Sequence, residues 1–510
     1  MRESLNSMIP AIAPGRQTAS TEPSVADAWF QWVSLAGIAS FLLALIAYNF
    51  VDIDIWHQMA LIRSSVHAGH LLRSDPFAYT PTYNSWVDHE WGAGVMAYFA
   101  TLWFGGRAIL ILKFLMAFGT GLICWRCSKE AGCDFRLWTF CAPLAIFLAH
   151  LGFFAAVRAQ VYSFFFAVLL MLFCQLDRNG SRKWMVVWLI LFPLWVNLHG
   201  GFVVGIGLMA LYIIEEAIRG RTVGHLLAVL VVMLLETLFT PYGTSYHVYL
   251  RRALLMARPF APEWRPVWDL GPYWVICFLA AVAVVGYAVA VAGIRKTPGI
   301  LQLAATAFEA ALHRKLLPLF AVAWLCYVPA YLEHTAIGQW MLSFMQRRRT
   351  FLIAAWGTLA CASLLAAVHQ KPWDIVVPQP IYPVGSVDYL ARQKFEGNVM
   401  VPFRVGAYVS WKLFPKVKVS LDSRYEETYP NQVVQQCFCF YEACPGWRDA
   451  LDAYPSQLVL VPRDSPVATK MPETGWQKVY RDQQFDLYTR PGLSLPLTDS
   501  SSTSFAGVFP

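Results

Sequence analysis

The residues best suited to chemistry gather in one stretch, 51–91, directly after the first long apolar run. Asp52 and Asp54 stand at alternate positions at its start, so an extended backbone there would turn both carboxylates towards one pocket. One could then act as a general base while the other orients it or binds a cation. The alternative is that the pair caps a helix and marks a membrane boundary. The spacing alone does not decide between the two.

Other polar side chains could bind a substrate beside this pair. Within 51–91 they are His57, Asp75, Asp88, His89 and Glu90, and further along the chain they are Arg158, Gln160, Asn197, His199 and Arg251. We expect them on the same face of a membrane as the acidic stretch. Arginine offers a bidentate fork to phosphate, so Arg158, His199 and Arg251 together would suit a phosphate group. A single arginine at a helix end more often extends to the interface, and a single histidine is more often structural.

Metal binding is a rival use of these residues. The histidines of 51–91 lack the H-E-x-x-H spacing of a zinc helix, so no zinc site is expected. Asp52 and Asp54 leave open a divalent cation, Mg²⁺ or Mn²⁺, without requiring one. Cys124 and Cys127 form a C-x-x-C with no second pair, which indicates helix-end cysteines rather than a metal or redox site.

The elements that position these residues are predicted to be membrane helices. The chain has 510 residues, 57% of them hydrophobic and only 14% charged, against about 25% charged in soluble proteins. We therefore expect an α-helical polytopic membrane bundle of about 11–12 helices, each spanning with about 20 residues, followed by a small soluble α/β domain. The expected parts are a disordered cytoplasmic tail at 1–28, a transmembrane domain at 29–369 containing the catalytic loop 51–91, a soluble extracytoplasmic domain at 370–492 and a disordered tail at 493–510.

The apolar runs predict the individual helices and their orientation. Runs occur at 30–50, 137–156, 161–176, 184–198, 202–218, 226–239, 273–292, 300–312, 316–332 and 351–368. The run 91–125 is too long for one helix and is broken at Gly105-Gly106, so it predicts two helices, or one crossing and one shallow helix. Basic residues in several connections place these in the cytoplasm by the positive-inside rule, which leaves 51–91 and the C-terminal domain outside. The outer loop 242–268 is also basic, and an anionic ligand would explain that exception.

The C-terminal region has the pattern of an α/β domain. Segments 398–402, 417–421 and 458–461 have the pattern of short buried strands, 485–489 alternates as an exposed strand does, and 446–452 is typical of an amphipathic helix. Cys437, Cys439 and Cys444 would allow one disulfide outside the cytoplasm.

Several classes of function are disfavoured. The net charge of +8 fits basic cytoplasmic loops, and no basic tract interleaved with aromatics predicts nucleic-acid binding. No G-x-x-x-x-G-K-[ST] and no strand–G-x-G-x-x-G–helix occurs, which argues against ATP-driven transport and Rossmann cofactors. The lack of an internal repeat counts weakly against a transporter built on inverted repeats.

The chain resembles bacterial GT-C-fold membrane glycosyltransferases in a series of segments that come in the same order. In the membrane part these are 52–57 (DIDIWH), 75–80 (DPFAYT), 86–91 (WVDHEW), 158–163 (RAQVYS), 195–201 (WVNLHGG), 240–243 (TPYG) and 314–320 (RKLLPLF). In the soluble part they are 406–411 (GAYVSW), 419–424 (VSLDSR) and 461–465 (VPRDS). The resemblance is to the uncharacterised branch of a superfamily whose other members transfer mannose or aminoarabinose from polyprenyl-phosphate carriers. Ala159 stands where the pattern has proline.

The resemblance implies both a fold and a mechanism. A polyprenyl-phosphate sugar in the outer leaflet of a bacterial inner membrane would present its headgroup to 51–91. Asp52 or Asp54 would deprotonate a hydroxyl of a glycan, lipid or protein acceptor, which attacks with inversion, and Arg158 would stabilise the departing lipid phosphate. Two other hypotheses stay open: a glycan or lipid-carrier transporter (flippase), and a non-catalytic scaffold that works through its soluble domain.

Overall fold

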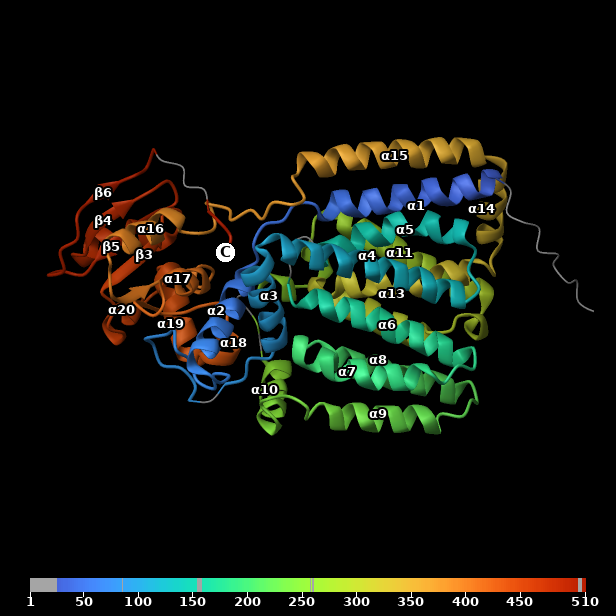
Figure 1. Ribbon diagram of the computed structural model, residues 1–510, viewed down its shortest axis with the longest axis horizontal. Helices are drawn as coiled ribbons and strands as arrows, with labels where there is room; N and C mark the ends of the chain where they lie inside the picture. Colours follow the sequence, from blue (N-terminus) through green and yellow to red (C-terminus); the bar gives the residue numbers. More distant parts are fainter. Residues whose placement is uncertain (1–24, 85, 154–157, 257, 259–260, 503–506) are drawn as a thin grey trace, which may run out of the picture.

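The computed structural model describes residues 25–84, 86–153, 158–256, 258, 261–502 and 507–510. It consists of a bundle of long helices and a smaller α/β part at one end of that bundle (Figure 1). Most of the tail predicted at 1–28 lies outside the described residues, and residues 25–28 belong to the first helix.

The bundle helices follow the apolar runs of the sequence closely. They are α1 (Val25–Ile46), α4 (Arg107–Glu130), α5 (Phe135–Ala149), α6 (Gln160–Arg178), α7 (Trp184–Leu198), α8 (Phe202–Ile218), α9 (Gly224–Glu236), α11 (Pro272–Ala292), α12 (Ile300–Leu312), α13 (Leu317–Leu332) and α15 (Arg349–His369). Within the described residues, seven helices are long and apolar enough to cross a membrane, and α7, α9 and α12 are shorter apolar helices. The predicted polytopic helical fold is confirmed.

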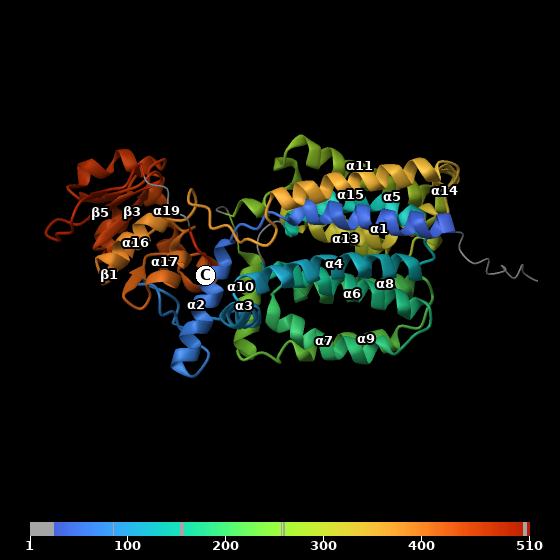
Figure 2. The same ribbon diagram turned by 45° about the horizontal axis from the view of Figure 1, so that its top comes forward.

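Burial distinguishes the centre of the bundle from its flank. The apolar window that contains α13 is 89% buried, whereas those of α11 and α15 are 17% buried and present apolar side chains that lipid can cover. Helix α1 packs along α15, and the two lie side by side in both ribbon views (Figures 1 and 2). Gly37 permits this approach, because a Cβ there would lie 2.6 Å from Cε3 of Trp356.

Four further helices do not correspond to separate apolar runs of spanning length. They are α2 (Ile53–Ala68), α3 (Trp91–Phe104), α10 (Thr244–Leu255) and α14 (Ala336–Arg347). Helices α3 and α10 lie across the end of the bundle next to the α/β part, and α14 lies across the opposite end (Figure 1). The run 91–125 thus divides at Gly105 into α3 and the long helix α4, as its length predicted.

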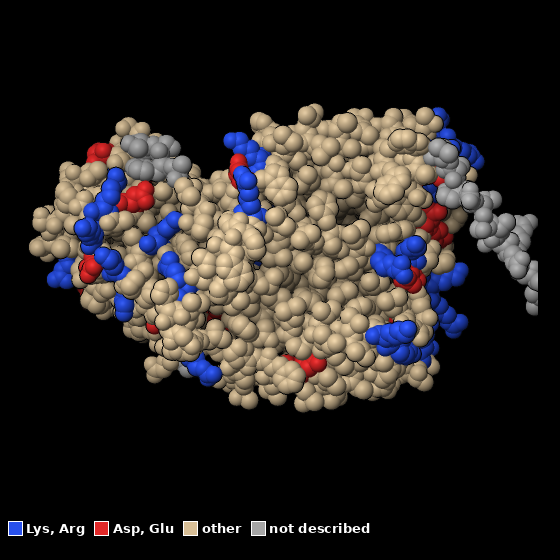
Figure 3. Space-filling model, viewed as in Figure 1, with Lys and Arg blue, Asp and Glu red and all other residues tan. Residues whose placement is uncertain are grey.

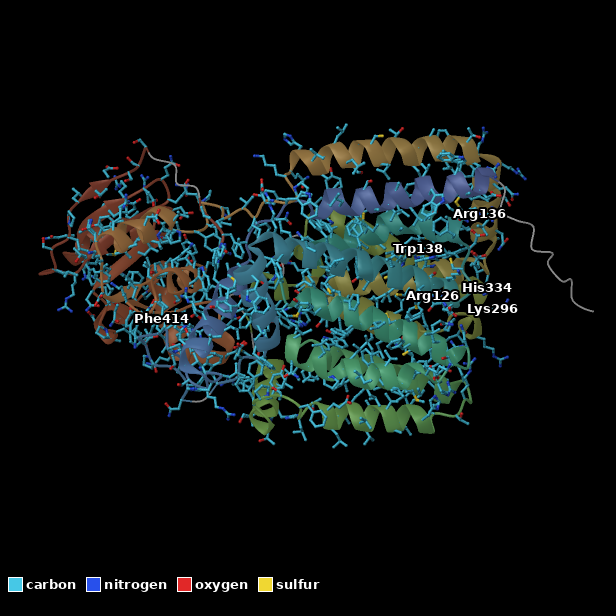
Figure 4. All side chains as sticks on the ribbon, in the orientation of Figure 1. Arg126, Arg136, Trp138, Lys296, His334 and Phe414 are labelled. Atoms are coloured by element: carbon cyan, nitrogen blue, oxygen red, sulfur yellow. The ribbon has the colours of Figure 1, made fainter. Side chains whose placement is uncertain are left out.

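The basic connections gather at the end of the bundle remote from the α/β part. Figure 3 shows Lys and Arg there, with a nearly uncharged flank between the two ends. Arg126, Arg136 and Lys296 lie at this end (Figure 4). Ion pairs link the helix ends at this side of the bundle: Arg178 at the end of α6 pairs with Glu215 and Glu216 near the end of α8. This segregation is the one that the positive-inside rule predicts.

The α/β part contains one mixed sheet with the strand order β2-β1-β3-β5-β4-β6. Its strands are β1 (Gly397–Met400), β2 (Val417–Val419), β3 (Leu458–Pro462), β4 (Gln477–Arg481), β5 (Phe485–Thr489) and β6 (Thr498–Asp499), and its helices are α16 (Val384–Arg392), α17 (Gly406–Leu413), α18 (Tyr425–Thr428), α19 (Asn431–Tyr441) and α20 (Asp449–Ala453). Strand β1 pairs in parallel with β2 and β3, with Val399 opposite Val419 and Leu458. Short 3₁₀ helices complete the chain: η1 (His150–Gly152), η2 (Pro262–Trp264), η3 (Val267–Asp269), η4 (Ile294–Lys296), η5 (Arg314–Leu316), η6 (Pro466–Thr469) and η7 (Met471–Thr474).

Two expectations for the C-terminal region were wrong. Strand β5 is buried along its whole length instead of exposing alternate residues, because it lies between β3 and β4. The described residues of the tail 493–510 include β6, which pairs with β4, and Gly507, which pairs with Val377. The Phe509 ring lies 5.3 Å from that of Trp56, so apolar contact holds the chain end in place. All eleven cysteines are free thiols.

The division at 369/370 does not separate two independent units. The segment after α2 adds to the edge of the C-terminal sheet: Val419 N–H donates to the Phe77 carbonyl at 3.0 Å, and Tyr79 N–H donates to the Val419 carbonyl at 3.1 Å. The rings of Phe77 and Phe414 meet edge to face at 4.8 Å (Phe414 is labelled in Figure 4). The predicted loop 51–91 therefore contains the helix α2, which packs against both α3 and α17, and a segment that adds to the edge of the C-terminal sheet.

Candidate functional site

A cavity of about 530 Å³ lies where the bundle end meets the α/β part. Of the residues that the sequence singled out, those that line it are Asp52, Asp54, His57, His89, Glu90, Arg158, Gln160 and His199. They come from α2, from the segment before α3, from the start of α6 and from the turn between α7 and α8. The fold thus brings together groups that lie about 150 residues apart along the chain, from Asp52 to His199.

Helix α2 fixes the two aspartates. Asp52 is its N-cap, with φ −75° and ψ 149°, and its Oδ1 accepts the Asp54 N–H at 3.1 Å. Asp54 lies in the first helical turn, where a carboxylate is favoured by the helix dipole. The extended backbone expected through both residues is absent. The pair does cap a helix, as the alternative interpretation proposed, and both residues also line the cavity.

Arg158 bridges three carboxylates from separate segments. Its Nε lies 3.1 Å from Asp52 Oδ2, and its Nη2 lies 3.5 Å from Asp54 Oδ2 and 3.9 Å from Glu263 Oε1. One guanidinium therefore orients the whole acidic group. Since these contacts engage its Nε and Nη2, Arg158 serves first as the counter-ion of the aspartates.

The two aspartates have different electrostatic environments. Burial raises the pKa of Asp54 well above its ordinary value, the charge of Asp52 raises it further, and Arg158 opposes both effects. Asp52 instead makes the shorter contact with Arg158 and also accepts a backbone N–H. Such an arrangement can assign different tasks to two neighbouring carboxylates, because the raised pKa of Asp54 favours proton transfer there while Asp52 holds the guanidinium.

His199 is held in one tautomer. Its Nδ1 accepts the Gly201 N–H at 3.0 Å and lies 2.7 Å from Ser163 Oγ, which in turn accepts Trp195 Nε1–H at 2.8 Å. The neutral ring therefore carries its proton on Nε2, which lies 3.4 Å from Glu90 Oε1. Burial lowers the pKa of His199 to about 4, so this ring stays neutral at physiological pH.

A second acidic group lies around Glu90. Glu90 accepts a hydrogen bond from Gln58 and lies 3.5 Å from His89 Nε2, while His89 Nδ1 pairs with Glu427. Burial by itself raises the pKa of Glu90, but His89 and the other imidazoles nearby outweigh burial and hold the pKa well below its usual range. His57 Nδ1 lies 2.7 Å from Ser423 Oγ, and burial together with Arg424 lowers the pKa of His57 to about 4.

Comparison with known proteins identifies the architecture. No protein-family model matches the chain, and no curated protein matches it in sequence. ArnT from Cupriavidus metallidurans, solved bound to undecaprenyl phosphate, matches in structure with a TM-score of 0.55 at 12% identity over 92% of this chain and 99% of ArnT. The archaeal oligosaccharyltransferase AglB from Archaeoglobus fulgidus, solved with an inhibitory peptide and a dolichol-phosphate, matches with a TM-score of 0.53 at 13% identity over 91% of this chain and 75% of AglB. This chain has the GT-C fold.

Four of the predicted residues lie outside the cavity. The side chain of Asp75 is fully buried, lies 2.6 Å from Arg424 Nη2 and ties the segment after α2 to the α/β part. Asp88 is buried and accepts the Glu90 N–H. Asn197 accepts a hydrogen bond from Trp91 Nε1 at 2.9 Å, and Arg251 is an exposed residue of α10. These four were expected to bind substrate, and none of them lines the cavity.

The cavity also contains residues that sequence reasoning missed. Glu263, Ser423 and Glu427 supply groups described above, and Arg314, Lys315 and Arg404 add cations to the lining. Lys315 Nζ lies 4.0 Å over the ring of Trp264, and the Gln160 side chain donates to the Lys315 carbonyl at 3.1 Å. Arg314 and Lys315 stand in one of the segments that resemble GT-C transferases, which was the available signal for them.

The carboxylates and histidines around the cavity are the side chains that would have to hold a divalent cation. Among the described residues, no group of three or more His, Cys, Asp or Glu is arranged to hold a metal ion. Asp52, Asp54 and Glu263 converge instead on the guanidinium of Arg158. These side chains fit an arginine better than a bound cation.

Proposed function

We propose that this chain is a membrane glycosyltransferase that moves a sugar from a polyprenyl-phosphate carrier to an acceptor hydroxyl. The observation that carries the proposal is the pair of carboxylates with opposed environments, Asp52 and Asp54, in a cavity at the end of a GT-C bundle. The fold comparison supports the same class, because ArnT was solved with undecaprenyl phosphate and AglB with a dolichol-phosphate.

In this proposal Asp54 is the general base and Asp52 is the anchor for Arg158. A base works best when its pKa lies near the working pH, and burial raises the pKa of Asp54 in that direction. Asp52 holds the guanidinium at 3.1 Å and so keeps one positive charge next to the base. That charge favours the ionised form of Asp54, which is the form that can take the proton of the acceptor hydroxyl.

The proposed reaction is a single inverting displacement. The acceptor oxygen forms a bond to the anomeric carbon while its proton passes to Asp54. The bond from the anomeric carbon to the phosphate oxygen breaks, and the electron pair leaves with the lipid phosphate. Negative charge grows on that phosphate, so a nearby cation lowers the barrier.

Lys315 and Arg314 are the residues proposed to receive the phosphate. They precede α13 at the bundle end, where a lipid-borne phosphate can reach them, and both line the cavity. Arg158 is engaged by three carboxylates, and Arg251 lies outside the cavity. This assignment replaces the phosphate site first expected from Arg158, His199 and Arg251.

The proposed location is a bacterial inner membrane with the cavity on the outer face. The basic connections at the far end of the bundle would face the cytoplasm. The cavity and the α/β part, at the other end, would then be extracytoplasmic and open to acceptors there. A glycan, a lipid or a protein hydroxyl would serve as acceptor.

The test measures sugar transfer in membranes that contain the wild type, Asp54→Asn or Asp52→Asn, supplied with a labelled undecaprenyl-phosphate sugar and acceptor extracts. We expect Asp54→Asn to lose about 10²–10⁴-fold in transfer rate, since that is the usual contribution of a general base. Full activity in both variants would remove the base assignment. Movement of intact carrier across the membrane without covalent change would instead identify a transporter, and neither activity would leave a scaffold.

A further inference from the structure

The α/β part turns its ligand-binding edge towards the cavity. Strands β1 and β2 are parallel, and the segments that follow them supply Phe403 and Arg404, then Ser423 and Glu427, to the cavity wall. Ligands of α/β sheets bind at the carboxyl ends of parallel strands, where loops are free to carry polar groups. The cavity therefore has one wall from the bundle and one from the α/β part.

Glu427 makes the closest contact between these two walls. It pairs with Nδ1 of His89, and Nε2 of the same ring lies 3.5 Å from Glu90 Oε1. With a carboxylate at each nitrogen, the ring is best satisfied as an imidazolium with two N–H donors. Glu90 in turn contacts Gln58 of α2 and His199 of the α7–α8 turn.

We propose that Glu427 is a positioning residue of the transfer site, holding Glu90 through His89 on the side of the cavity that receives the acceptor. This inference rests on the proposed function and gives the α/β part a role in acceptor recognition. Glu90 and Glu427 are both acids, so an anionic lipid phosphate is repelled from them and stays near Lys315 and Arg314. A neutral acceptor rich in hydroxyl groups can donate hydrogen bonds to Glu90 instead.

The charges around His89 make this arrangement dependent on Glu427. Burial alone lowers the pKa of His89, but Glu427 and Glu90 outweigh burial and raise the pKa well above its ordinary value. Other titratable or charged groups face this cluster: Asp88, His57, His199, Arg424, Arg158, Tyr246 and Tyr249. Without the charge of Glu427 the pKa of His89 falls, and the pKa of Glu90 then rises because its cation is lost.

A thermal-unfolding experiment on the full-length protein in detergent tests the contact without any activity assay. Glu427→Gln is compared with Glu442→Gln, which removes an exposed acid from the same part of the chain. Because the pKa of His89 is raised on folding, protonated His89 stabilises the folded state fully below about pH 6.5, the pKa of histidine in an unfolded chain. This stabilisation is lost as the pH rises through the pKa of His89 in the folded state. We expect Glu427→Gln to lower the Tm by about 2–4 °C relative to the wild type at pH 6. This difference in Tm should become smaller towards pH 10. Glu442→Gln should leave the Tm unchanged at every pH.

Transfer kinetics then test the role in the site. We expect Glu427→Gln to lower kcat/KM for the acceptor by about 10-fold or more, mainly through a higher KM for the acceptor, and to leave undecaprenyl-phosphate affinity unchanged. A difference in Tm between the two variants that does not vary with pH, or wild-type acceptor kinetics in Glu427→Gln, overturns this inference alone. Absence of transfer by the wild type overturns the proposed function, and the positioning role falls with it.

Discussion

Replacing Arg158 by glutamine removes the cation shared by Asp52, Asp54 and Glu263, and it tests the electrostatic basis of the site. At 3.1 Å from Asp52, two unit charges attract by roughly 5 kcal/mol at an effective dielectric constant of about 20. The Arg158 side chain is 33% exposed, so solvent screening reduces the net value to about 1–3 kcal/mol. That corresponds to a loss of roughly 5–150-fold in the population of correctly oriented carboxylates.

The pH dependence of stability gives this prediction its sign. The pKa of Asp54 is raised in the folded state, so the contribution of Asp54 to the free energy of unfolding falls as the pH rises above the pKa that Asp54 has in the unfolded chain. Loss of Arg158 raises the pKa of Asp54 further and leaves the ionised acids uncompensated. The difference in Tm between wild type and Arg158→Gln should therefore be small near pH 4 and larger at pH 8.

The assay is differential scanning fluorimetry of the detergent-solubilised protein across pH 4–8, with the transfer rate measured in parallel. Arg158→Lys keeps the charge but loses the planar fork, so it should fall between wild type and Arg158→Gln. Arg251→Gln is the matched control, since Arg251 is exposed on α10 and outside the cavity. A Tm difference that does not vary with pH, or an equal loss in Arg251→Gln, would refute the reasoning.

Two other predictions follow from residues on either side of the cavity. Asp75→Asn removes one of the two buried carboxylates, Asp75 and Asp422, that contact Arg424, so it should cost about 1–3 kcal/mol of unfolding free energy. Denaturant titration measures this loss, and an unchanged free energy of unfolding would contradict the buried pairing. Lys315→Met should weaken undecaprenyl-phosphate binding by about 10-fold, because one charge-assisted contact is lost. Lys296→Met, at the opposite end of the bundle, is the control and should not change the affinity. Equal affinities of the two variants in a direct binding assay would exclude Lys315 from the phosphate site.

The bundle could be predicted from sequence because its signal is local. Runs such as 184–198, 202–218 and 300–312 coincide with α7, α8 and α12 residue for residue, since a helix in lipid must satisfy its own backbone and be apolar over a span. Helices α2 and α10 were not predicted, because their polar residues suppress the apolar signal and their burial depends on partners distant in the chain. Strand β5 was misread for the same reason: burial on both faces comes from β3 and β4.

The candidate site was predictable in its location and less so in its composition. Asp52, Asp54 and Arg158 were found because charged residues next to apolar runs are rare and costly. Asp75 has the same residue type in the same segment, yet its partner Arg424 lies 349 residues away and takes it out of the cavity. Glu263 and Glu427 carried no local pattern at all, so only the fold shows that Glu263 shares Arg158 with the aspartates and that Glu427 contacts His89.

The pairing of residues 77–79 with Val419 has a consequence for biosynthesis. Thr80, in the same segment, donates to the carbonyl of Ser420, a contact that spans 340 positions of the chain. The ribosome has therefore synthesised all helices of the bundle before the partner of this early segment exists. Until residue 417 is synthesised, the backbone donors and acceptors of this segment lack their partners in β2, and a chain truncated there also lacks the cavity residues Ser423, Arg424 and Glu427.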